Sequence, residues 1–88
     1  MKAKINLRFV VTEKGFHKKL AVALDFPKYY GNNLDALFDV LTERSNPLQI
    51  EFLNWRFFAL RHKDFMQKLN RVFANARQEG APLSVEFL

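Results

Sequence analysis

Apolar and polar residues alternate in three short segments of this chain. Every second residue of 3–11 is apolar, and residues 48–53 and 83–88 alternate in the same way. A period of two residues is typical of a β-strand with one face toward a core and the other toward water. The pattern therefore predicts three strands, with Phe9 and Val11 on the buried face of the first.

Two helices are expected between the first and second strands, because apolar residues recur there at helical spacing. The first should begin after Thr12, a residue type that caps helices, and end at Phe26-Pro27, since a residue before proline is pushed out of the helical conformation. The second should span residues 33–43, with an asparagine as its cap and Ser45-Asn46-Pro47 as its stop.

Two more helices are expected before the last strand. A short one should cover residues 55–61 with Asn54 as its cap, and a longer one should open at Asp64, whose spacing from Gln67 resembles a capping box. Gly80 is placed to end the longer helix in a left-handed conformation.

The resulting order, β-αα-β-αα-β, indicates an α/β fold. Strands joined by helical crossovers must pair in parallel. Parallel strands covered on both faces usually read as continuous apolar runs, whereas these strands alternate. We therefore expect a three-stranded parallel sheet with four helices mostly on one face. Without a Gly- or Ser-rich linker, residues 1–88 are expected to form a single domain.

Composition argues against an enzyme. A chain of 88 residues can bury one core but hardly a separate walled cavity. There is no cysteine, His17 and His62 stand alone, and the three glycines are too scattered for a phosphate-binding loop. We expect no catalytic residue, no cofactor and no metal, and surface or partly packed positions for both histidines.

No segment resembles a membrane span or a signal peptide. Lys2, Lys4 and Arg8 interrupt the N-terminal segment, and the longest apolar run, residues 20–24, has five residues. A membrane-spanning helix needs about 20 apolar residues. The expectation is a soluble cytoplasmic protein without a membrane partner.

One acidic stretch stands out in an otherwise basic chain. The formal net charge is +5, but residues 29–43 contain Asp35, Asp39 and Glu43 and no Lys or Arg. On a helix Asp35, Asp39 and Thr42 share one face. Two carboxylates one turn apart repel each other mildly, which suggests a partner that supplies positive charge.

The opposite face of the same helix is apolar and should face the core: Leu34, Leu37, Phe38 and Leu41. Tyr29 and Tyr30 precede the helix, beside the acidic face, and aromatic anchors next to charges are typical of interface hot spots. Ordinary solvated acids and tyrosines packed in a loop or core would give the same pattern. The pattern alone leaves both interpretations open.

Residues 27–42 resemble the signature of the barstar family, intracellular inhibitors of small extracellular ribonucleases. The segment Pro-Lys-Tyr-Tyr-Gly-Asn-Asn-Leu-Asp-Ala-Leu-Phe-Asp-Val-Leu-Thr agrees with the pattern Pro-x-Tyr-Tyr-Gly-x-Asn-Leu-Asp-Ala-Leu-x-Asp-x-Leu-Thr wherever that pattern specifies a residue. The family fold has a three-stranded parallel sheet and four helices, the order expected above.

The resemblance implies a mechanism. In this family the second helix and the loop before it occupy the active site of the ribonuclease. A carboxylate matching Asp39 takes the place of a substrate phosphate, Asp35 binds a neighbouring basic group, and Tyr29 packs against the catalytic histidine. The implied contact surface comprises Tyr29, Tyr30, Asn33, Leu34, Asp35, Phe38, Asp39, Thr42, Glu43 and Asn75. The expected assembly is a 1:1 complex of a bacterial immunity protein or antitoxin with a ribonuclease, without a small-molecule substrate.

The chain also departs from the family. The best-known member is acidic overall, and this chain is basic. Phe38 replaces a tryptophan, Glu43-Arg44 stands where Gly-Trp is usual, and Asn75 aligns with a glutamate that reaches the enzyme. These differences suggest a cognate enzyme of different sequence and specificity.

Two other interpretations remain. A nucleic-acid-binding module could use a basic surface made of Lys14, Lys18, Lys19, Arg61, Lys63, Lys68, Arg71 and Arg77. Against it, most phenylalanines fall on core stripes rather than in a stacking platform, and no nucleic-acid-binding motif is recognisable. Alternatively, a barstar-like regulatory protein could bind a partner that is not a ribonuclease.

Overall fold

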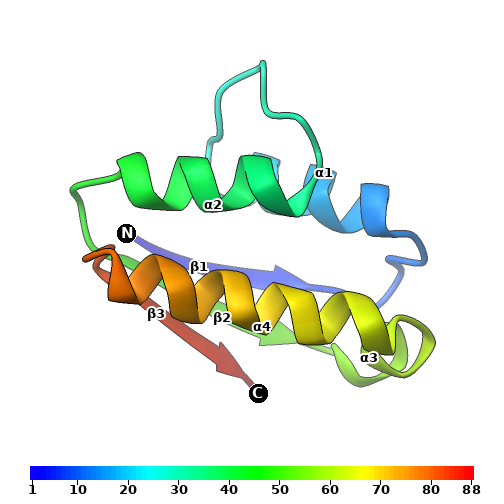
Figure 1. Ribbon diagram of the computed structural model, residues 1–88. Coiled ribbons are helices and arrows are strands. Elements are labelled where there is room, and N and C mark those ends of the chain that lie inside the picture. Colours follow the sequence, from blue (N-terminus) through cyan, green and yellow to red (C-terminus); the bar gives the residue numbers. More distant parts are fainter.

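The computed structural model describes residues 1–88 and contains three strands and four helices (Figure 1). They are β1 (Lys2–Asn6), α1 (Glu13–Ala23), α2 (Leu34–Glu43), β2 (Leu48–Leu53), α3 (Arg56–Arg61), α4 (Lys63–Gln78) and β3 (Leu83–Phe87). This order confirms the expected β-αα-β-αα-β arrangement. None of the helices combines the length and the apolar character needed to cross a bilayer.

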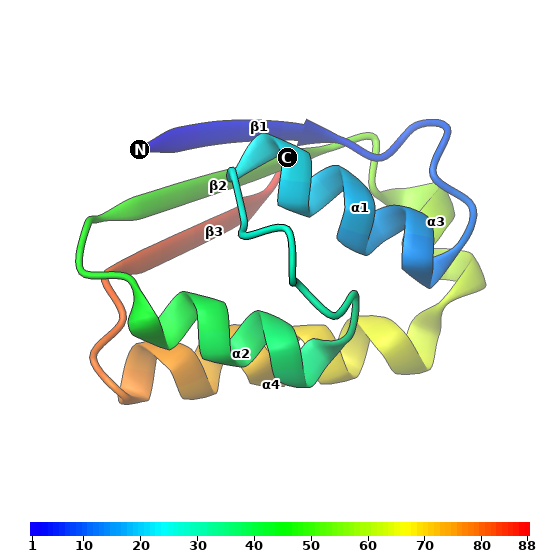
Figure 2. The same ribbon diagram turned by 90° about the horizontal axis from the view of Figure 1, so that it is seen from above.

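The sheet has the order β1-β2-β3, and both neighbouring pairs are parallel. All four helices lie on the same side of it (Figure 2). The other face is open and polar: Lys4, Glu51 and Glu86 form one row across the three strands, and Lys2 Nζ lies 3.8 Å from a Glu51 carboxylate oxygen. The alternating strands therefore indicated the one-sided packing correctly.

A cluster of phenylalanine rings joins the helices to the sheet. Phe16 of α1 is fully buried, and its ring centroid lies 5.7 Å from that of Phe52 on β2 and 5.5 Å from that of Phe58 on α3. Phe65 of α4 meets the Phe16 ring edge-on at 5.3 Å. One side chain thus contacts three elements that are distant in sequence.

Helices α1 and α4 end in the same way, although only one has the expected glycine. Gly80 has φ +96°, and Ala81 N–H donates to Ala76 O at 3.0 Å. At the end of α1, Asp25 takes the left-handed position with φ 54°, and Phe26 N–H donates to the carbonyl five residues earlier at 2.9 Å. Both are Schellman-type ends. The expectation that α1 continues to Phe26-Pro27 is wrong, because aspartate supplies the turn after Ala23 and Leu24.

The first strand is shorter than expected. It ends at Asn6, whose side-chain oxygen accepts the Arg8 N–H at 2.9 Å and turns the chain away from the sheet. Phe9 is 85% exposed and Val11 is 59% exposed. Both were expected on the buried face, so the alternation in the sequence extends beyond the strand itself and does not indicate burial there.

Two of the expected caps are also wrong. Asn54 lies in the left-handed region with φ 52°, and its amide donates to Asn6 Oδ1 at 3.0 Å instead of capping α3. Helix α4 begins at Lys63, so Asp64 lies inside its first turn and forms no capping box. Thr12 is a true cap, since its hydroxyl accepts the Gly15 N–H at 2.9 Å.

A pair of substitutions tests this arrangement. Phe16→Ala should reduce the free energy of unfolding by roughly 3–5 kcal/mol, because it removes a ring that contacts three elements. Phe9→Ala, which truncates the same side chain in solvent, should change it by less than about 0.5 kcal/mol. Urea unfolding followed by circular dichroism measures both, and equal losses would contradict the described core.

Candidate functional site

Helix α2 presents its acids to solvent because its apolar stripe is taken up by the core. Leu37 and Leu41 are fully buried, whereas Asp35, Asp39 and Glu43 are exposed. The three exposed acids follow one another at intervals of four residues, and we call them the acidic face. Leu34 and Phe38 are half-buried at the borders of the stripe.

The negative charge of this face is not neutralised within the chain. The contacts between basic and acidic side chains join Lys2 to Glu51 and the His62 imidazole to Glu13, and neither involves α2. Arg44 follows the helix directly, but its guanidinium donates to the Leu24 carbonyl at 3.2 Å. It therefore ties the ends of α1 and α2 together and leaves the acids free.

The helix dipole favours the first of these charges and opposes the last. Asp35 lies in the first turn, where a negative charge is favourable, but the last turn carries Glu43 and no basic residue. An acid near a helix C-terminus opposes the dipole. Glu43 therefore lowers the stability of the helix slightly, and a cation bound next to it would offset this loss.

The two adjacent tyrosines have different environments. Tyr29 is 80% exposed, whereas Tyr30 is 8% exposed and its hydroxyl lies 2.6 Å from His17 Nδ1. The Tyr30 ring also packs on Phe26, with centroids 4.9 Å apart. This corrects the expectation that both tyrosines stand beside the acidic face, because Tyr30 belongs to the core and holds the loop in place.

His17 is the residue that sequence reasoning misjudged most. It was expected at the surface or partly packed, but it is 2% exposed, and its ring packs at nearly right angles to the Phe16 and Phe65 rings. Desolvation lowers the pKa of His17 and raises the pKa of Tyr30, so both stay neutral near neutral pH. The sequence did contain a sign of this burial, because His17 stands three residues before Leu20 on the apolar stripe of α1.

The start of α2 is held by hydrogen bonds of Asn33. Its side-chain oxygen accepts the Ala36 N–H at 2.8 Å, and its amide donates to Gly31 O at 3.2 Å. A Cβ at Gly31 would lie 3.2 Å from that amide, tighter than most real contacts. The predicted asparagine cap is therefore confirmed, and its polar groups are turned toward the chain.

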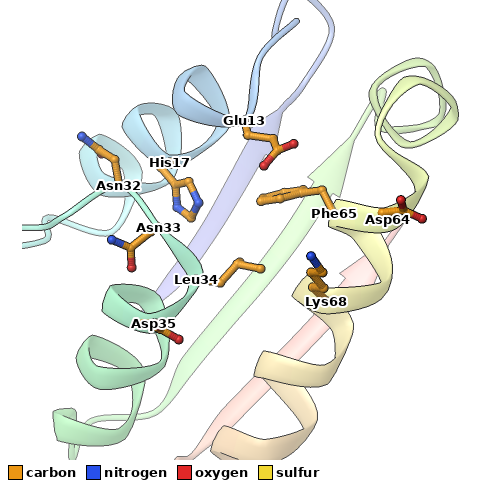
Figure 3. A pocket seen from close by; sticks show the side chains of 9 residues that line it. All are labelled: Glu13, His17, Asn32, Asn33, Leu34, Asp35, Asp64, Phe65 and Lys68. Atoms are coloured by element: carbon orange, nitrogen blue, oxygen red, sulfur yellow. The ribbon is translucent and has the colours of Figure 1, made fainter.

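A groove of about 330 Å³ separates the start of α2 from α1 and α4 (Figure 3). Asp35 lines it on one side, Lys68 and Asp64 on the side of α4, and His17 and Phe65 at the base. Lys68 is the one Lys or Arg side chain that lines the groove with Asp35, and it makes no ion pair. No three His, Asp or Glu side chains converge so that they could hold a metal ion.

The remaining expected contact residues lie at different places. The Thr42 hydroxyl donates to the Phe38 carbonyl at 2.9 Å, and Thr42 is half-buried. Asn75 is exposed on α4, the helix that packs beside α2 (Figure 1). Tyr29 and Asn33 thus lie in the loop that leads directly into the acidic face of α2, and Asn75 lies on the helix that packs against α2.

Two comparisons with known proteins bear on this arrangement. The model of a protein family described as "Barstar (barnase inhibitor)" matches residues 1–88. A protein of Bacillus subtilis (strain 168) named "Putative ribonuclease inhibitor YrdF" is 50% identical over 42 residues, which are 47% of this chain and 46% of that protein. The matched segment thus spans about half of each chain.

The buried histidine should make the stability of the fold depend on pH. Its pKa is lowered in the folded state, so below about pH 6.5 the unfolded chain takes up a proton that the folded chain does not. The free energy of unfolding should therefore fall as the pH drops from 7.5 to 5, by at most ~1.4 kcal/mol per pH unit from this group.

Urea unfolding of wild type and His17→Asn across this range measures that contribution. The variant should be less stable at pH 7.5 but should lose less stability on acidification. Equal slopes for both proteins would show that His17 titrates alike in the folded and unfolded chains.

Proposed function

Because this chain belongs to the barstar family, whose model matches residues 1–88, we propose that it inhibits a partner ribonuclease by placing the acidic face of α2 in the enzyme's active site. The observation that carries the proposal is the row of exposed carboxylates that no basic residue of the chain pairs with. The protein is then a binding partner rather than an enzyme.

The chemistry of a ribonuclease cleft suits such a row. An enzyme that binds RNA phosphates needs cationic side chains, and these can bind a carboxylate through short, charge-assisted hydrogen bonds. In an α-helix Asp35 and Asp39 are separated by about 6 Å along the axis, so they can reach neighbouring cationic groups. We assign Asp39 to the phosphate position and Asp35 to an adjacent basic group.

The loop before α2 is prepared for this role. The Tyr30 hydroxyl on His17 and the Asn33 cap fix the loop at two points near α2, while Tyr29 is exposed to solvent. Ordering a loop before binding reduces the entropy lost on association. Tyr29 is then available to pack on the enzyme, with Leu34, Phe38, Thr42, Glu43 and Asn75 around the two aspartates.

The overall charge affects the approach more than the contact. A net charge of +5 does not steer the protein toward a basic enzyme, but charges beyond about 8 Å are largely screened at physiological ionic strength. The contact therefore depends on the local acids of α2. We place the protein in the bacterial cytoplasm, as the immunity protein or antitoxin of one ribonuclease, in a 1:1 complex.

Removing the central carboxylate should abolish tight inhibition. Asp39→Ala leaves the cationic groups of the enzyme desolvated and unpaired, which should weaken the complex by about 3 kcal/mol or more, roughly a hundredfold. Isothermal titration calorimetry against ribonucleases and toxin domains of the source organism measures the change.

The matched control is Glu86→Ala, which removes an exposed acid from the open face of the sheet. It should bind as wild type does. If Asp39→Ala binds as tightly as Glu86→Ala, the acidic face is not the contact surface. If the protein inhibits no ribonuclease but captures another protein through Asp39, the regulatory interpretation replaces this one.

The two tyrosines should separate binding from stability. Tyr29→Ala should weaken the complex and leave the thermal midpoint nearly unchanged, because the ring is exposed. Tyr30→Phe removes the hydrogen-bond partner of a buried histidine and should lower the free energy of unfolding by about 1–3 kcal/mol. Differential scanning calorimetry and inhibition assays on both variants test this, and a Tyr30→Phe protein as stable as wild type would contradict the described loop.

A further inference from the structure

Several apolar side chains at the α3 end of the molecule are exposed and have no part in the proposed inhibition. Phe9 and Val11 lie in the loop between β1 and α1, and Phe57 and Leu60 lie on α3. The His62 side chain joins the two segments through a 2.8 Å hydrogen bond to Val11 O. Figures 1 and 2 show the loop and the helix at the same end of the molecule.

Each exposed phenylalanine at this end is in cation–π contact with an arginine. The Arg8 guanidinium lies 5.3 Å from the Phe9 ring centroid, and that of Arg61 lies 5.5 Å from Phe57. Arg56 lies 4.8 Å from the ring of the half-buried Trp55. These are the cation–π contacts of the whole structure. We call this surface the arginine–aromatic end: Arg8, Phe9, Trp55, Arg56, Phe57 and Arg61.

We propose that the arginine–aromatic end binds single-stranded RNA. Unpaired bases stack on open aromatic rings and on guanidinium planes, and the remaining N–H groups of arginine bind phosphates. Phe9 is 85% exposed and Phe57 is 59% exposed, so each ring keeps open surface beside its arginine. A stacking platform was discounted from the sequence because phenylalanines were assigned to core stripes, and Phe9 was placed on the wrong side.

The charge around these rings favours an anionic ligand. On α3 the exposed residues Arg56, Phe57, Leu60 and Arg61 form the outward face, Lys63 follows, and the helix itself contains no acid. Glu13 and Asp64 lie beside this surface, on the side of the groove. Because these acids repel phosphates, we expect the RNA to follow the outer side of α3. The acidic face of α2 repels RNA, so the two surfaces select opposite partners.

A membrane is the less favoured ligand for this surface. Helix α3 has six residues and is too short to lie as an amphipathic anchor in a bilayer interface. Arginines paired one to one with rings also suit a ligand that alternates flat bases and phosphates better than a continuous apolar layer.

Fluorescence anisotropy with a labelled oligouridine, which has little secondary structure, tests the proposal. The double variant Phe9→Leu/Phe57→Leu keeps the apolar area but removes the rings, and it should bind about tenfold more weakly or worse. Phe57→Trp should bind at least as well as wild type. Arg56→Gln/Arg61→Gln should reduce the slope of log affinity against log salt by roughly 0.7 for each phosphate that the variant no longer binds.

The control Lys18→Gln/Lys19→Gln removes the same charge from exposed positions of α1. If it weakens RNA binding as much as Arg56→Gln/Arg61→Gln does, the binding is general electrostatic attraction and the proposal is wrong. No binding of wild type to oligouridine, or leucine variants that bind RNA normally, also overturn it.

Vesicles of mixed anionic and neutral phospholipids provide the second arm. Binding to vesicles without binding to RNA would assign the surface to a membrane and overturn the proposal. Asp39→Ala should bind RNA at least as tightly as wild type does, because it removes a charge that repels RNA, so a defect in ribonuclease inhibition and a defect in RNA binding can be told apart.

Discussion

The contact of the Phe16 ring with Phe52 and Phe58 holds the helical layer to a single face of the sheet. Because α1, α3 and α4 meet at this ring, α2 is left at the outside of the helical layer and packs on α4 (Figure 2). It fully buries Leu37 and Leu41 and half-buries the residues beside them. Of its residues, only Asp35, Asp39 and Glu43 are exposed, which explains how a domain of this size can expose a row of acids without disturbing its core.

Neighbouring residues in the loop and helix divide the structural and the binding roles between them. Tyr30 secures the loop through His17, whereas Tyr29 is exposed; Asn33 directs its hydrogen bonds to the chain, whereas Asp35 is free. Glu43 even opposes the helix dipole. Such placements reduce stability slightly, and they are expected where a surface is adapted to a partner.

Local patterns predicted much of the fold and the orientation of the acids. The bounds of β2 and the Asn33 start of α2 followed from strong periodicity and a good cap. The errors arose where single polar side chains decide the backbone turn or the packing: Asn6 turns the chain before Phe9, Asp25 replaces a glycine, and the Tyr30 hydroxyl gives the buried His17 a hydrogen-bond partner. Hydrophobic periodicity does not specify such hydrogen bonds and turns. The family resemblance, rather than periodicity, suggested the ribonuclease partner.

If the acidic face takes the place of an RNA phosphate, the protein and a small phosphate ligand must compete for one pocket of the enzyme. The dissociation constant of the complex with a cognate ribonuclease should therefore be measured at increasing concentrations of a mononucleotide, with ionic strength held constant. We predict that the apparent dissociation constant rises linearly with the mononucleotide concentration, as for two ligands of one pocket. A constant that does not change would mean that the protein binds outside the phosphate site.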